Sequence, residues 1–219
     1  MNLPNAITSG RILSTPFIAT LPFIPSGWVR LGAFILYIAV AITDYYDGKL
    51  ARARNLVTDL GKMLDPLADK LLLFATLIPM YMLMAPAGRG PFSNELHGAY
   101  KFVTPLGEVG LSWWIVAIVI GRELFMTIFR QYAARKGVVI SAIGPAKWKT
   151  GFQCTWVGSA FFWFFAATLA AERGWKGSPW NAFANFNGIV GVVTMIGALF
   201  LTLYSLWLYM RRYGYVITR

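Results

Sequence analysis

Long apolar runs alternate with short polar segments along this chain of 219 residues. Five runs are bounded by proline, glycine or charged residues, and they cover residues 31–42, 71–84, 113–120, 152–171 and 189–210. These runs approach or reach the roughly 20 residues with which an α-helix crosses a bilayer. A sixth segment, residues 6–24, is broken by polar positions and Pro16, so its first turns are expected to lie flat on the membrane surface. The pattern predicts an all-α integral membrane protein with six transmembrane helices and an N-terminal interfacial helical segment.

The composition agrees with a membrane protein. Hydrophobic residues make up 57% of the chain and charged residues 13%, whereas soluble domains carry about 25% charged residues. No long linker, internal repeat or low-complexity tract divides the sequence, so we expect a single membrane-embedded domain over residues 1–219. The lone Cys154 excludes an internal disulfide, and its apolar neighbours in the sequence predict a buried, inert thiol.

The positive charge is unevenly spread along the chain. The formal net charge is +11, but the basic residues do not gather on a recognisable nucleic-acid-binding module, so no nucleic-acid partner is expected. Thirteen basic residues fall on one predicted side of the membrane and five on the other. Because cytoplasmic loops are enriched in lysine and arginine, this bias predicts that both termini and the second and fourth loops are cytoplasmic.

The acidic residues are few and clustered. Of nine in the chain, five fall within 26 positions: Asp44, Asp47, Asp59, Asp65 and Asp69. Asp44 and Asp47 are three residues apart, and Asp65 and Asp69 are four apart, so each pair lies on one face of its predicted helix. A short cytoplasmic connection between the two helices brings the pairs back side by side. We therefore expect four carboxylates to converge at the membrane boundary.

Four close carboxylates repel one another unless cations neutralise them or some take up protons. Oxygen ligands without nearby cysteine or histidine favour Mg²⁺, Mn²⁺ or Ca²⁺ over Zn²⁺. The alternative is an ion-pair network with the neighbouring basic residues, which are Lys49, Arg52, Arg54, Lys62 and Lys70. Two matched pairs of acids at the membrane boundary favour the metal site over that network.

The same residues form a known pattern. The string Asp44-x-x-Asp47-Gly48-x-x-Ala51-Arg52, eight residues, then Gly61-x-x-x-Asp65-x-x-x-Asp69 resembles the CDP-alcohol phosphotransferase signature at every defined position. The resemblance implies a six-helix membrane fold, usually dimeric, in which a CDP-linked donor meets an alcohol acceptor and CMP leaves. It also implies two metal ions, Mg²⁺ or Mn²⁺, near the cytoplasmic face. Asp44, Asp47, Asp65 and Asp69 would be the ligands, with Asp69 also the general base.

Small and basic residues of the signature suit the CDP-linked donor. Gly48, Ala51 and Gly61 lack bulk and would let a nucleotide or diphosphate approach closely, although small residues also let helices pack in lipid. Arg52 offers a planar fork of donors for phosphate oxygens, and the alternative is a charge that only fixes topology. The motif favours donor binding for these four residues.

Four cations further along the chain suit an anionic acceptor. They are Arg122, Arg130, Lys147 and Lys149. Arg122 and Arg130 are about 12 Å apart along a helix and turned by roughly 80°, so both are expected to flank one groove and grip a phosphate. Glu123 is expected to point elsewhere. The alternative for Arg130 and the lysines is attraction to anionic lipid.

Further blocks resemble the bacterial phosphatidylglycerophosphate synthase branch of this family. They are Asn2-Leu3-Pro4-Asn5 with Thr8 and Arg11, the stretch from Leu64 to Lys70, and Arg122-Glu123 followed by Arg130. The resemblance implies that CDP-diacylglycerol and glycerol 3-phosphate react in the bacterial inner (cytoplasmic) membrane, giving phosphatidylglycerol phosphate and CMP at a cytoplasmic active site.

The acidic cluster also allows other functional interpretations. Inositol phosphate, serine or phosphatidylglycerol are alternative acceptors within the same family. A cation- or proton-coupled transporter is the alternative from another class, because intramembrane acids also carry ions. Transport acids usually lie near the bilayer midplane, whereas these cluster at one boundary. Their position therefore favours the transferase.

Overall fold

The computed structural model describes residues 3–53, 59–85, 100–141 and 144–218, without the side chains of residues 3–5, 44–53, 59–63, 65 and 218. The described chain forms six long helices: α1 (Leu3–Thr20), α2 (Gly27–Ala53), α3 (Asp59–Met84), α4 (Trp113–Arg135), α5 (Gly144–Arg173) and α6 (Ser178–Tyr213). Two short helices, η1 (Leu21–Phe23) and α7 (Tyr215–Thr218), and two strands, β1 (Phe102–Thr104) and β2 (Gly107–Val109), complete it.

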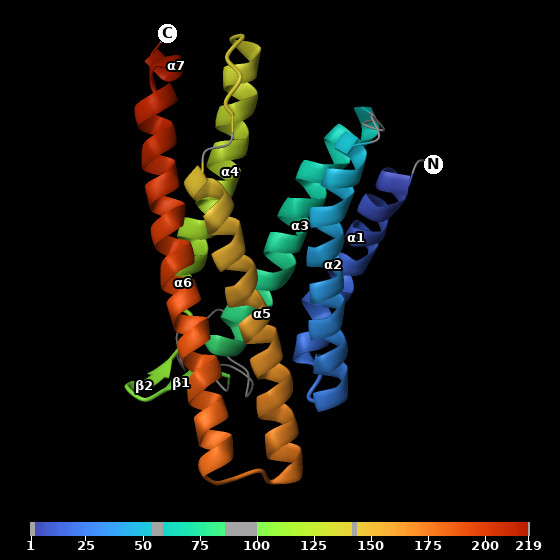
Figure 1. Ribbon diagram of the computed structural model, residues 1–219, viewed down its shortest axis with the longest axis vertical. Coiled ribbons are helices and arrows are strands. Elements are labelled where there is room, and N and C mark those ends of the chain that lie inside the picture. The colour runs from blue at the N-terminus through green and yellow to red at the C-terminus, as the bar shows by residue number, and fades with distance from the viewer. Residues whose placement is uncertain (1–2, 54–58, 86–99, 142–143, 219) are drawn as a thin grey trace.

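The long helices run along one axis of an elongated bundle (Figure 1). α1 packs against α2 and α3, α2 packs against α5, and α6 packs against α5 and α4. The start of α1, the end of α2, the start of α3 and α7 lie at one end of the bundle, which we call the terminal end; the α5–α6 turn lies at the opposite, far end (Figure 1). That turn is tight because Gly174 and Gly177 take φ values of 64° and 105°, which favour glycine.

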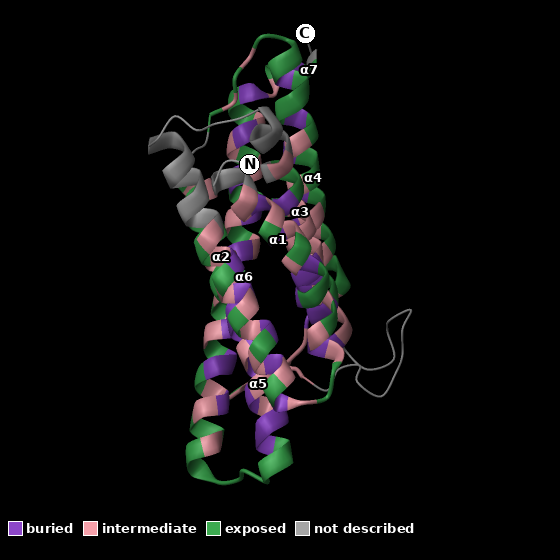
Figure 2. Ribbon diagram, turned by 90° about the vertical axis from the view of Figure 1, so that its right-hand side faces the viewer, coloured by how far each residue is buried: buried purple, intermediate pink, exposed green. Residues whose placement is uncertain are grey.

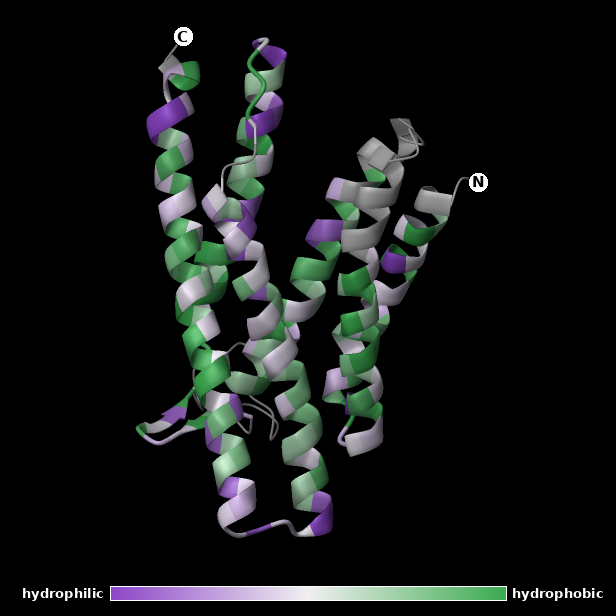
Figure 3. Cartoon of the chain, in the orientation of Figure 1, coloured by the Kyte–Doolittle hydropathy of each residue, from purple (hydrophilic) through white to green (hydrophobic). Residues whose placement is uncertain are grey.

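Three described helical segments are long and apolar enough to cross a bilayer: Pro66–Met84, Gly144–Arg173 and Ser178–Tyr213. A shorter apolar helix covers Gly27–Thr43. Hydrophobic residues dominate the shafts of α5 and α6, whereas hydrophilic residues gather at the α5–α6 turn (Figure 3). The protein is therefore mostly helical with several long apolar helices, as the sequence predicts.

The hairpin β1–β2 was not predicted, so the expectation of a purely α-helical chain is wrong in this detail. Phe102 of β1 is buried and packs onto α6 at Gly191. A side chain at Gly188 or Gly191 would overlap with the backbone of Val103 or the ring of Phe102. The indole of Trp163 donates a hydrogen bond of 3.0 Å to the carbonyl of Lys101. The hairpin is thus fastened to both α5 and α6.

The interior of the bundle is rich in aromatic residues, and buried positions follow the inward faces of the helices (Figure 2). Tyr37 of α2 stacks on Phe161 of α5 at 5.5 Å between ring centroids. Phe164 meets Tyr100, which precedes β1, edge to face at 5.7 Å. These contacts join α2, α5 and the hairpin segment into one hydrophobic core.

One arginine is enclosed in this aromatic core. Arg30, in the first turn of α2, is 1% exposed. It donates hydrogen bonds to the carbonyl of Pro22, at 2.9 Å, and to the hydroxyl of Thr168. Its guanidinium lies 4.4 Å from the ring centroid of Tyr100. The positive charge is therefore met by a carbonyl, a hydroxyl and a π face.

Candidate active site

A polar cavity of about 380 Å³ lies between α1, α2, α3, α4 and α5. Its charged lining residues are Arg11 of α1, Asp69 and Lys70 of α3, Glu123 and Arg130 of α4, and Lys149 of α5. Four of these side chains are cationic and two are acidic, so the described charged lining has an excess of two positive charges. An anionic ligand suits such a surface.

Asp69 is the acid of the signature whose side chain the structure describes. Its carboxylate is 59% exposed and accepts a hydrogen bond of 2.8 Å from Arg11, whose side chain is 4% exposed. Because α1 packs against α3, Arg11 reaches Asp69 from the neighbouring helix. This contact fixes one carboxylate oxygen and leaves the group accessible from the cavity.

Arg11 was not assigned a role from the sequence, although it belongs to one of the blocks that carry the family resemblance. Its partner is 58 residues away along the chain. Spacing within a helix reveals neighbours three or four residues apart and gives no information on a pair that forms between helices.

Glu123 was expected to point elsewhere, and this expectation is wrong. Its Oε1 atom accepts a hydrogen bond of 2.8 Å from Arg122 and another from Lys149 of α5. Arg122 and Lys149 are buried, whereas the Glu123 side chain is 27% exposed and lines the cavity. Glu123 and Arg122 are adjacent in α4, but both side chains are long enough to meet across the helix surface. One carboxylate therefore pairs with two buried cations, and the three groups together keep one positive charge.

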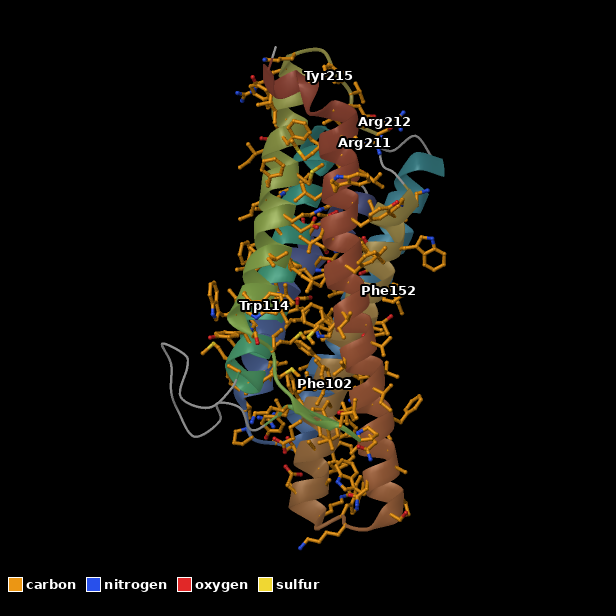
Figure 4. The ribbon with its side chains drawn as sticks, turned by 90° about the vertical axis from the view of Figure 1, so that its left-hand side faces the viewer. Phe102, Trp114, Phe152, Arg211, Arg212 and Tyr215 are labelled. Atoms are coloured by element: carbon orange, nitrogen blue, oxygen red, sulfur yellow. The ribbon has the colours of Figure 1, made fainter. Side chains whose placement is uncertain are left out.

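Helix α6 supports the two arginines of α4 from behind. Arg122 donates a hydrogen bond of 2.9 Å to the hydroxyl of Ser205, and Arg130 donates one of 3.1 Å to the hydroxyl of Tyr209. Side chains of α4 and α6 face one another along this part of the bundle (Figure 4). Neither Ser205 nor Tyr209 was singled out from the sequence, because a serine and a tyrosine in an apolar run give no distinctive signal.

The predicted acceptor residues occupy different layers. Arg130 and Lys149 line the cavity, whereas Arg122 lies behind Glu123 and does not belong to the described lining. Lys147 is exposed in the first turn of α5 and likewise does not belong to it. Cys154 lines the cavity and is exposed, so the expectation of a buried thiol is wrong.

The other signature residues are placed only by their helices. Asp44, Asp47, Gly48, Ala51 and Arg52 lie in the last turns of α2, and Gly61 and Asp65 lie in the first turns of α3. Their side chains lie outside the described residues. The helix bounds agree with the predicted helical pairing of Asp44 with Asp47 and of Asp65 with Asp69.

The helix bounds also place both pairs towards the end of α2 and the start of α3, on the side of the terminal end (Figure 1). Among the side chains that the structure describes, no three histidine, cysteine, aspartate or glutamate residues converge. The side chains of Asp44, Asp47 and Asp65 lie outside this set, so the predicted metal site stays a prediction.

A second hollow, of about 470 Å³, lies at the far end. Its lining consists mainly of aromatic rings from Phe162, Phe165, Trp175, Trp180 and Phe183. Lys176 is its charged lining residue, and no acidic residue contributes to it in the part of the chain that the structure describes. Among its described lining residues this hollow therefore lacks a carboxylate to hold a metal ion or take up a proton, and the polar cavity is the candidate active site.

Comparisons with known proteins agree with the resemblance. The chain is 35% identical over 165 residues to the CDP-diacylglycerol–glycerol-3-phosphate 3-phosphatidyltransferase of Bacillus subtilis, covering 69% of this chain and 72% of that protein. It is 32% identical over 163 residues to enzyme 1 of the same name from Arabidopsis thaliana, covering 71% of this chain. It is also 28% identical over 218 residues to the CMP-forming cardiolipin synthase of Oryza sativa, covering 97% of this chain and 57% of that protein.

The match to the family as a whole is longer than the match to most single relatives. The chain spans 49% and 61% of the lengths of the two Arabidopsis enzymes. The profile of the family described as CDP-alcohol phosphatidyltransferase, by contrast, matches residues 1–204 and so includes α1 to α5 and most of α6. The chain therefore belongs to the CDP-alcohol phosphatidyltransferase family.

Proposed function

We propose that this protein transfers the phosphatidyl group from CDP-diacylglycerol to glycerol 3-phosphate, giving phosphatidylglycerol phosphate and CMP. The observation that supports this most directly is the cationic cavity around Asp69, in which Arg130 and Lys149 face a carboxylate that is accessible to a ligand. A phosphate monoester satisfies the positive charge, and its free hydroxyl provides the nucleophile. The names of the Bacillus and Arabidopsis relatives support the same acceptor.

In this reaction the acceptor phosphate binds Arg130 and Lys149, and Arg122 acts one layer behind by holding Glu123. The acceptor hydroxyl oxygen attacks the phosphorus that bears the diacylglycerol group, and the bond from that phosphorus to the CMP oxygen breaks. Asp69 takes the hydroxyl proton, while Arg11 keeps its carboxylate oriented. Lys147 adds positive charge at the start of α5 in this proposal.

Asp44, Asp47, Asp65 and Asp69 would hold two Mg²⁺ or Mn²⁺ ions. Carboxylate oxygens suit these hard cations, and the exposed Asp69 carboxylate offers a free approach. When bound, a pair of such ions neutralises a diphosphate and stabilises the attacking and leaving oxygens. In this proposal Arg52 binds the diphosphate, and the small residues Gly48, Ala51 and Gly61 let the donor approach α2 and α3.

We further propose that all six long helices cross the membrane and that the terminal end is cytoplasmic, as the charge bias predicts. Single cysteines introduced after Cys154→Ser test the orientation. An impermeant thiol reagent applied to intact cells should label position 176 and not position 54. Labelling of position 54 alone would reverse the orientation. The homodimer implied by the family resemblance stays a prediction.

A cardiolipin synthase is the second candidate, because the rice relative aligns with 97% of this chain. Its acceptor would be phosphatidylglycerol, which carries a phosphodiester with one negative charge. Glycerol 3-phosphate carries a monoester with up to two charges and no acyl chain. The charge excess of the cavity favours the monoester.

The acceptor is tested with purified protein, CDP-diacylglycerol and radiolabelled acceptors offered in pairs at equal concentration. The panel is glycerol 3-phosphate, phosphatidylglycerol, inositol 1-phosphate and serine. We expect glycerol 3-phosphate to be used in preference to each of the others, with release of CMP. Preference for phosphatidylglycerol, inositol 1-phosphate or serine would overturn the acceptor assignment and leave the reaction class intact. Absence of CMP release with every acceptor would overturn the reaction class.

A further inference from the structure

Tyr209 of α6 lies directly beneath the two arginines of α4. The side chain is fully buried, at 0% exposure. Its ring centroid is 5.5 Å from the guanidinium carbon of Arg130 and 5.9 Å from that of Arg122. Its hydroxyl accepts the hydrogen bond of 3.1 Å from Arg130. One aromatic residue therefore contacts two cations that are eight positions apart along α4.

The contact restrains Arg130 in two ways. The cation–π contact fixes the face of the guanidinium, and the hydrogen bond fixes one edge. Arg130 is exposed and would otherwise sample many rotamers, so holding it in one of them has an entropic cost that a preformed contact lowers. An arginine has five N–H donors, and among the described residues Arg130 uses one of them in the hydrogen bond to Tyr209. The remaining donors stay available on the side that lines the cavity.

We infer that Tyr209 is a positioning residue for the acceptor: it holds the Arg130 guanidinium in the orientation that binds the acceptor phosphate. This inference rests on the proposed function, because it needs an acceptor that carries a phosphate. Tyr209 is fully buried and belongs to α6, whereas the described lining of the cavity comes from α1 to α5, so Tyr209 does not touch the acceptor. It acts through Arg130, and its effect appears in acceptor binding.

A role in packing alone makes a different prediction. Tyr209 also packs with Met126, Phe129 and Tyr213 in a small hydrophobic cluster. Tyr209→Phe keeps the ring, its packing and its cation–π contact, and removes only the hydroxyl. If packing were its only role, this variant would leave acceptor binding unchanged.

The test measures initial rates of Tyr209→Phe against each substrate, with CDP-diacylglycerol and glycerol 3-phosphate. We expect the KM for glycerol 3-phosphate to rise about threefold to tenfold, from the loss of one hydrogen bond to a charged group. The donor KM, kcat and apparent Tm should stay near wild-type values. Tyr204→Phe is the matched control, because Tyr204 lies on the same helix, is 41% exposed and stacks on Phe200.

A double-mutant cycle with Arg130→Ala completes the test. Because Tyr209 acts through Arg130, adding Tyr209→Phe to Arg130→Ala should raise the acceptor KM no further. An unchanged KM in Tyr209→Phe, or additive effects in the double variant, would overturn the inference while Arg130→Ala still supports the phosphate site. If Arg130→Ala itself leaves the acceptor KM unchanged, the proposed phosphate site fails and the inference fails with it.

Discussion

Arg30 and Arg122 are both buried, but their surroundings differ. Arg122 is 7% exposed, pairs with the Glu123 carboxylate at 2.8 Å and lies one layer behind a polar cavity. Arg30 is 1% exposed and meets a carbonyl, a hydroxyl and the face of Tyr100. Within the described residues, it has no carboxylate partner. The same side chain thus occurs once beside a candidate site and once inside a packed core.

The difference shows how polar groups are stabilised in two regions: the packed core around Arg30 and the surroundings of the polar cavity. A buried charge is costly unless it is paired or hydrogen-bonded. Around Arg30 the polar groups are few, and its hydrogen bonds to Pro22 and Thr168 join α2 to η1 and to α5. Around Arg122 the carboxylate of Glu123 is shared with Lys149, and more cations than acids remain along the cavity. That surplus is what a ligand of opposite charge requires.

Removal of divalent metal is expected to have the largest effect. In excess chelator, release of CMP should fall to background and return on addition of Mg²⁺ or Mn²⁺, since four signature carboxylates without metal repel a diphosphate donor. The measurement is CMP release by purified protein. Full turnover in chelator would contradict the proposal that two metal ions bind beside the polar cavity.

Asp69→Asn should lower kcat by about 10²–10⁴-fold, because the amide preserves the shape of the side chain and accepts no proton. Binding of CDP-diacylglycerol, measured directly, should be retained. Glu108→Gln is the matched control: Glu108 lies on the hairpin, is 65% exposed and pairs with Lys101 at 3.5 Å. Near-normal turnover in Asp69→Asn would exclude Asp69 as the base.

Arg122→Ala should raise the KM for glycerol 3-phosphate by roughly tenfold to a hundredfold, because Glu123, which also pairs with Lys149, loses its contact with Arg122. The donor KM should change much less. Arg122→Lys should restore part of the effect, since an ammonium keeps the charge and not the planar fork. Equal rises in both KM values would indicate a general disturbance of the fold.

Arg30→Ala should give the smallest change in activity and a clear change in stability. Loss of its buried contacts and volume should destabilise the fold by about 2–3 kcal/mol, which lowers the apparent Tm in detergent. Both KM values should stay near wild type, in contrast to Arg122→Ala. A selective rise in the acceptor KM of Arg30→Ala would contradict the assignment of Arg30 to the packed core and of Arg122 to the acceptor site.

Much of the fold follows from the sequence. Apolar periodicity predicts the shafts of the long helices, because a helix that faces lipid or core must repeat apolar residues along its length. It underestimates their ends: the run at residues 113–120 continues as α4 to Arg135 through polar residues, of which Arg122 is buried and Gln131 and Arg135 are exposed. The strands β1 and β2 are three residues each, too short to show a period of two.

The sequence identified single site residues by motif and by charge, but it did not reveal the contacts that form between helices. Asp69, Arg130 and Lys149 were found from motif and charge, and the cavity brings them together. The contacts of Arg11 with Asp69 and of Arg130 with Tyr209 join residues 58 and 79 positions apart. The orientation of Glu123 depends on Lys149 of α5, so it depends on packing that α4 alone does not contain.

The close approach of the hairpin to α6 has a consequence for the distant cavity. Gly191, where Phe102 is seated, and Tyr209, which holds Arg130, are 18 residues apart, or five turns at 3.6 residues per turn. The two positions therefore share one face of α6, about 27 Å apart along its axis. The contact of Phe102 with Gly191 therefore restrains the rotation of α6 about its axis, and this rotation decides whether Tyr209 faces α4. A bulky side chain at Gly191 would overlap with Phe102, and a rotation of α6 that relieved the overlap would move the Tyr209 hydroxyl away from Arg130.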